Sequence, residues 1–92
     1  MVNPSNTLDA SYATYNPCLL LIRERGYEVR VQCYGKHPSD LRCLYFAING
    51  TIQLVANSGP ELLGLVVLWD THGERWNIQE PDIIDEVIES EQ

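Results

Sequence analysis

Leu41 to Ala56 reads LRCLYFAINGTIQLVA, and this stretch decides the fold class. Two runs rich in β-branched and aromatic residues flank Asn49-Gly50, the dipeptide most typical of a tight β-hairpin turn. The sequence therefore predicts a strand from Leu41 to Ile48 and a returning strand from Thr51 to Ala56.

The residues that follow the hairpin predict a helix that covers the sheet. Ser58 at the N-cap places Glu61 at the spacing of a capping box, and Pro60 falls in the first turn, where its missing N–H costs little. The helix is predicted from Glu61 to about Thr71, with Gly73 as its stop. Apolar residues occupy most of its circumference, so we expect it to be buried on several sides as the central core element.

A shorter helix is predicted from Pro81 to about Ser90. One narrow stripe of this helix is apolar and the opposite face is acidic, with Ile83, Ile84, Val87 and Ile88 against Asp82, Asp85, Glu86 and Glu89. A helix of about ten residues is marginal in water by itself, so we expect this one to need a surface to dock on.

The stretch from Pro17 to Tyr34 has two interpretations. As a hairpin it would turn at Arg25-Gly26, and as a helix it would start after Asn16 and end before Gly26. We favour the hairpin by a narrow margin, because the run CLLLI at positions 18–22 shows no helical stripe. Under either interpretation, residues 28–34 alternate as a strand.

The helical alternative gives the element order α-β-β-β-α, which is similar to that of a double-stranded-RNA-binding domain. The similarity is one of element order only. The basic cluster that this family carries at the start of its last helix is replaced here by Gly59-Pro60-Glu61. No RNA-binding function is therefore carried over.

The fold class predicted from these elements is α+β. We expect a small three- or four-stranded antiparallel β-meander packed on one face by a buried helix, with a short C-terminal acidic amphipathic helix at its edge. At 45% hydrophobic and 21% charged, 92 residues suffice for one small core. Residues 1–15 are predicted to be a flexible N-terminal tail, and residues 16–92 a single domain.

Strand alternation predicts which side chains leave the core. We expect the inward set Val29, Val31, Cys33, Leu44, Phe46, Ile48, Ile52 and Leu54. The opposite face would then present Arg30, Tyr34 and Tyr45, residue types that protein interfaces use as anchors. Nucleic-acid binders use similar faces, but a net charge of −7 opposes binding to phosphate.

A loop near the middle of the chain carries potential metal ligands. Cys33, His37, Asp40 and Cys43 offer the groups that zinc prefers, but the spacing C-x3-H-x5-C matches no common zinc motif. Cys33, His37 and Cys43 are therefore weak candidates for a metal or thiol site, and we favour cysteines buried as small apolar residues. A Cys–His catalytic pair would lack an oxyanion hole, so we predict no enzyme activity and no cofactor.

Two features predict a cytoplasmic chain without a membrane anchor. The start MVNPSNTLDAS has neither the basic nor the apolar region of a secretory leader, and no run approaches a membrane span. An odd number of cysteines, three, is also awkward for a secreted disulfide scaffold.

The negative charge is concentrated in the last third of the chain. Residues 60–92 hold nine acids and one base, whereas residues 1–59 hold four acids and five bases. This pattern makes nucleic acid an unsuitable ligand and a basic protein surface a suitable one. We predict a small binding or regulatory protein, similar in kind to an immunity or inhibitor protein, that presents Asp82, Asp85, Glu86 and Glu89 to a basic partner. The alternative is a structural homodimer formed through the C-terminal helix or a sheet edge.

Overall fold

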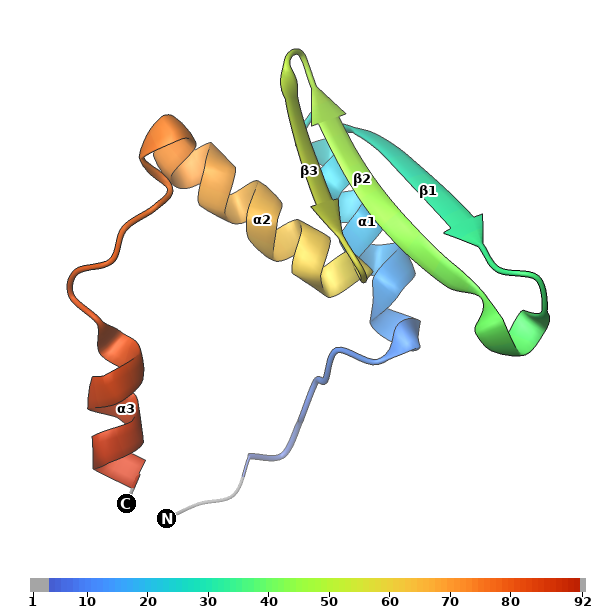
Figure 1. The fold of residues 1–92 in the computed structure, drawn as a ribbon. Helices are drawn as coiled ribbons and strands as arrows, with labels where there is room; N and C mark the ends of the chain where they lie inside the picture. The colour runs from blue at the N-terminus through green and yellow to red at the C-terminus, as the bar shows by residue number, and fades with distance from the viewer. Residues whose placement is uncertain (1–3, 92) are drawn as a thin grey trace.

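The computed structural model describes residues 4–91, and at its centre a three-stranded antiparallel sheet carries two helices on one face (Figure 1). The strands follow one another in chain order as a meander: β1 (Glu28–Tyr34), β2 (Arg42–Asn49) and β3 (Ile52–Ala56). The helices are α1 (Tyr15–Glu24), α2 (Gly59–His72) and α3 (Ile83–Glu91). The predicted α+β class and antiparallel meander are confirmed, with three strands.

The first helix corrects the hairpin favoured for residues 17–34. α1 begins at Tyr15, inside the predicted tail, and ends at Glu24, with Gly26 at φ 91° in the turn that follows. Its buried stripe is made by Tyr15, Leu19 and Ile22, at the spacing i, i+4, i+7. The stripe starts three residues before the apolar run, which is why that run alone showed no helical period.

The hairpin between β2 and β3 turns one residue later than Asn49-Gly50. Asn49 pairs with Ile52, which leaves Gly50 and Thr51 as the two loop residues. Gly50 has φ 60° and the next loop residue, Thr51, has a negative φ, as in a type II′ turn with glycine at its first central position. Glycine is needed at that position because a side chain would strain the left-handed backbone.

The pairing also corrects the predicted faces of β2. Residues directly opposite each other in an antiparallel pair share a face, and Ala47 lies opposite both Val29 and Leu54. Tyr45 and Ala47 therefore point toward the helices and are buried, whereas Phe46 and its apolar neighbours Leu44 and Ile48 lie on the open face. Residues 44–48 are apolar throughout, so only the pairing decides which of them face the core.

The capping interactions of α2 agree with the sequence. The Ser58 hydroxyl accepts a hydrogen bond from the Glu61 N–H at 3.2 Å, and the Glu61 carboxylate accepts one from the Asn57 N–H at 3.2 Å. The helix starts at Gly59, where an added Cβ would lie 2.9 Å from the Tyr15 backbone. Glycine at this position is what allows α1 and α2 to approach each other.

α2 is less enclosed than its composition predicted. Only Gly59, Leu62 and Val66 are buried along its length, and Val67 is 42% exposed. The helix packs on the sheet near its start and contacts α1 both there and at Asp70 in its last turn, while its outer half extends past the edge of β3 (Figure 1). Its C-terminal half therefore has apolar side chains with no second layer beyond them.

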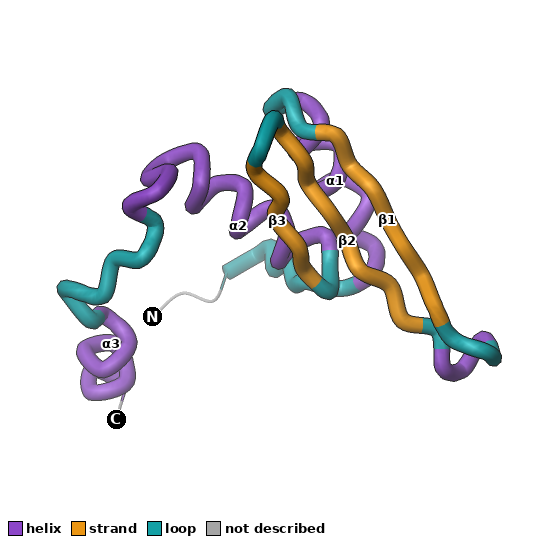
Figure 2. The backbone as a smooth tube through the Cα atoms, turned by 45° about the horizontal axis from the view of Figure 1, so that its top comes forward, coloured by secondary structure: helices purple, strands orange, loops and turns teal. Residues whose placement is uncertain are grey.

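α3 does not pack at the edge of the sheet, which corrects the predicted arrangement (Figures 1 and 2). Every residue from Glu74 to Glu91 is exposed. The radius of gyration is 16.3 Å, whereas a compact chain of this length has about 12 Å.

In the described part of the chain, no helix is long and apolar enough to cross a bilayer.

Candidate functional site

α3 is the element that carries the predicted partner-binding acids. It starts at Ile83, two residues later than predicted, and the Asp82 carboxylate accepts a hydrogen bond from the Ile84 N–H at 3.1 Å. Asp82 therefore satisfies one of the N–H groups that the start of a helix leaves unpaired.

The two faces of α3 are both open to solvent. Along its apolar stripe the exposed fractions are large: Ile83 58%, Ile84 68%, Val87 51% and Ile88 49%. Asp85, Glu86 and Glu89 lie on the other face, and none of them forms an ion pair within residues 4–91. Asp85 and Glu89 are four residues apart, so their like charges repel and weaken the isolated helix. A basic, partly apolar surface would cover the exposed stripe and offset the repulsion between the acids.

The open face of the sheet carries two of the predicted interface residues. Arg30 and Tyr34 lie on this face of β1, and Arg30 forms a salt bridge with Glu28 on the same strand at 3.1 Å. Behind them, the half-buried side chains of Phe46 and Ile48 line a shallow hollow of about 350 Å³. This apolar centre was not predicted from the sequence, because Phe46 and Ile48 were assigned to the core.

Tyr45 does not belong to that face. Its side chain is buried beneath α1, and its ring meets the Tyr15 ring edge-on with centroids 5.6 Å apart. Burial raises the pKa of Tyr45, because the phenolate would lose its hydration. Tyr45 is a core residue, and its prediction as a partner-binding residue is wrong.

The predicted cysteine–histidine loop is closed by a disulfide. Cys33 and Cys43 lie opposite each other on β1 and β2 and are bonded to each other, while Cys18 on α1 is a free thiol. Of the four candidate ligands in this loop, only His37 and Asp40 remain unbonded. Within residues 4–91, no three His, Cys, Asp or Glu side chains come together as metal ligands would.

A polar cluster that sequence reasoning missed connects α1 to α2. Asp70 on α2 accepts a hydrogen bond from the Tyr27 hydroxyl at 2.6 Å and another from the Arg25 guanidinium at 2.9 Å. Burial, aided by the Asp70 carboxylate, raises the pKa of Tyr27 to about 12. Asp70 is 43 positions from Tyr27 and 45 from Arg25 in the chain, and no local pattern indicates that they meet.

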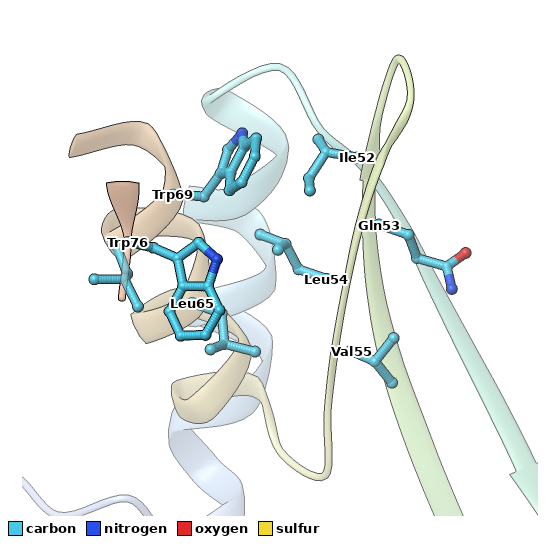
Figure 3. Close-up of a pocket in the computed structure, with 8 residues that line it drawn as sticks. Ile52, Gln53, Leu54, Val55, Leu65, Trp69 and Trp76 are labelled. Atoms are coloured by element: carbon cyan, nitrogen blue, oxygen red, sulfur yellow. The ribbon is translucent and has the colours of Figure 1, made fainter. Parts of the chain in front are cut away.

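A groove runs between β3 and the outer half of α2 (Figure 3). It has a volume of about 330 Å³, and apolar side chains dominate its lining: Ile52, Leu54, Leu65, Leu68, Trp69 and Trp76. In Figure 3 the two indole rings face this groove, whereas Gln53 and Val55 point to the opposite side of the sheet. The sequence did not indicate this groove, because α2 was predicted to be buried on several sides.

Comparisons with family models, with curated proteins and with solved structures find no match to this chain. α3, the open sheet face and the groove are the features of this chain that indicate a function.

Proposed function

We propose that this chain is a small non-catalytic binding protein whose α3 helix presents an acidic, amphipathic surface to a basic protein partner. The observation that supports it is the exposure of both faces of α3, whose stripe includes Ile84 at 68% and Val87 at 51%. Apolar residues placed singly on a surface need no partner, but a continuous stripe on one helix face is typical of a binding element.

The charge of α3 defines the chemistry of that partner. Its acids form no ion pair in the described chain, so a groove rimmed by lysine or arginine would complement them. Amphipathic helices bind such grooves through residues at i, i+3 and i+4, the spacing of Ile84, Val87 and Ile88. Nucleases and DNA-binding proteins offer basic surfaces of this kind, in keeping with an inhibitor-like role.

Two full-length variants with the same net charge test the proposal. In the first, Asp85→Asn, Glu86→Gln and Glu89→Gln remove three of the four acids of α3. In the control, Glu24→Gln and Glu74→Gln with Asp40→Asn neutralise three exposed acids elsewhere. At about 0.5 kcal/mol for each surface charge pair, losing three weakens binding about tenfold. The measurement is salt-dependent capture from extract of the source cell, with the bound protein identified by mass spectrometry.

We expect a basic protein to be captured by the parent chain and by the control, and to be lost from the α3 variant and at high salt. Equal capture by all three chains contradicts the role of α3. Equal loss from the control shows that net charge alone matters and also contradicts it. Because α3 does not pack on the sheet, circular dichroism melting should give the same midpoint for all three chains.

A further inference from the structure

The two edges of the sheet are built differently, and β3 is the unprotected one. β1 carries the exposed charged residues Glu28 and Arg30, as edge strands of monomeric proteins commonly do. β3 reads IQLVA, without a charge, a proline or a glycine. Unprotected edges of this type pair readily with another strand.

The backbone of β3 has hydrogen-bonding groups available for such pairing. Asn49 and Ile52 flank a two-residue turn, so they form a hydrogen-bonded pair in the ladder. The alternation of an antiparallel ladder then directs the N–H and C=O groups of Gln53 and Val55 away from β2. These groups need either water or another strand as their partner.

α2 is positioned to cover a strand that the described chain does not supply. Its outer half extends past β3 (Figure 1), and the groove beneath it is lined by Leu65, Leu68, Trp69 and Trp76 (Figure 3). In an α+β fold the helices pack on a face of the sheet, and the described sheet ends at β3, short of this half of α2. A fourth strand beside β3 would fill the groove and pair the free backbone groups.

We propose that β3 of a second copy of this chain supplies that strand, so that two copies form one six-stranded antiparallel sheet about a two-fold axis. With Leu54 on the axis, Gln53 of each copy lies opposite Val55 of the other, and the outer halves of both α2 helices cover the junction. Self-pairing requires a patch that does not repel itself, and β3 carries no charge although the chain has a net charge of −7. The acids of α3 lie away from this patch, so its partner surface stays available.

The area of the patch is close to what a specific interface needs. Trp76 and Val55 are 50% and 38% exposed, and Leu65, Leu68 and Trp69 are half-buried. Together with the backbone of β3 they expose roughly 500 Å² of surface in each copy. This estimate takes about 150–250 Å² as the area that a fully buried aromatic side chain removes from water. Pairing would bury about 1,000 Å² in total, the lower limit for a biological interface, so we expect a dimer that depends on concentration.

Sedimentation of the full chain from about 1 to about 200 µM tests the proposal, a range matched to an interface of this size. The test variant combines Gln53→Lys with Val55→Lys, which places like charges opposite each other across the axis. The control combines Gln32→Lys with Tyr34→Lys on the exposed outer strand β1, with the same change in net charge. We expect the dimer constant to weaken at least tenfold in the test variant and to stay unchanged in the control.

Hydrogen exchange separates β3 pairing from other ways of associating. In the dimer, the amides of Gln53 and Val55 should become protected as the concentration rises, and both indole emissions should shift to the blue. A monomer throughout the range overturns the proposal, as does a dimer that survives the β3 lysines or is equally lost from the control. The variant Ile84→Ser with Ile88→Ser tests whether α3 of the same chain occupies the groove instead. If this variant exposes the tryptophans of a monomer, α3 of the same chain fills the groove and the proposal is wrong.

Discussion

The contacts of Asp70 hold the outer half of α2 against the end of α1, and removing the Tyr27 hydroxyl measures their strength. Tyr27→Phe deletes the 2.6 Å hydrogen bond to Asp70 and leaves the 2.9 Å contact from Arg25 in place. A hydrogen bond to a charged group is worth about 1.5–3 kcal/mol. The Asp70 side chain is 32% exposed and water can replace part of the bond, so we expect a loss of about 1–2 kcal/mol.

Asp70→Ala should cost more, about 2–3 kcal/mol, because it also removes a partly exposed ion pair worth at most about 1 kcal/mol. Combining Tyr27→Phe with Asp70→Ala should lower the free energy of unfolding by less than the sum of the two single losses, since both changes delete the same hydrogen bond. Urea unfolding followed by tryptophan emission gives the free energies, and each kcal/mol corresponds to a melting shift of about 4–8 °C. Tyr34→Phe, on the exposed face of β1, is the control and should change stability by less than about 0.5 kcal/mol.

The same bond predicts how stability depends on pH. The pKa of Tyr27 is about 12 in the folded chain and about 10 when unfolded, so the folded state holds this proton more tightly. The stabilisation is therefore complete below about pH 10 and is lost as the pH rises to about 12. Tyr27→Phe should flatten this decline, leaving the smaller contribution of Tyr45 in the same direction. If the variant costs under about 0.5 kcal/mol, or its high-pH decline matches the parent, the contact does not stabilise the fold.

Two further predictions concern a covalent link and a helix contact. Reduction of the disulfide between Cys33 and Cys43 should lower the free energy of unfolding by about 2–3 kcal/mol, from the loop entropy of ten residues. Mass spectrometry after alkylation in urea should find one reactive thiol, Cys18, before reduction and three after it, and three at the start would refute the bond. Gly59→Ala should destabilise by about 1–3 kcal/mol, because its Cβ would meet the α1 backbone at 2.9 Å. Gly64→Ala has no atom within 4 Å of its added Cβ and should stabilise by about 0.5–1 kcal/mol, so equal effects would show that the helices do not meet at Gly59.

The elements that sequence predicted well are those whose information is local. The capping box of Ser58 and Glu61 and the stop at Gly73 depend on residues within one helical turn, and they are present in α2. The hairpin was recognisable for the same reason, although its turn moved by one residue to Gly50 and Thr51. The acids and the apolar stripe of α3 likewise follow directly from spacing in the chain.

The features that sequence predicted wrongly depend on contacts between distant segments. Tyr15 becomes part of the α1 stripe because Gly59 and Tyr45 come to lie against it, and no window around residues 18–22 contains that fact. Tyr45 faces inward because the register between β1 and β2 sets it opposite Val31, on the same face of the sheet as Val29 and Ala47.

The sequence alone determined which segments after α1 form strands and which form α-helices. It also determined the acidic and apolar faces of α3 and the lack of charge on β3, because these are properties of neighbouring residues. Only the tertiary structure decided that Cys33 bonds Cys43, that Asp70 meets Tyr27, and that α2 extends past the sheet. The physical reason is that an apolar run indicates that burial is favourable without specifying the surface that provides it. In this chain α1 and the sheet cover one side of α2, while the groove side of its outer half and the stripe of α3 remain exposed.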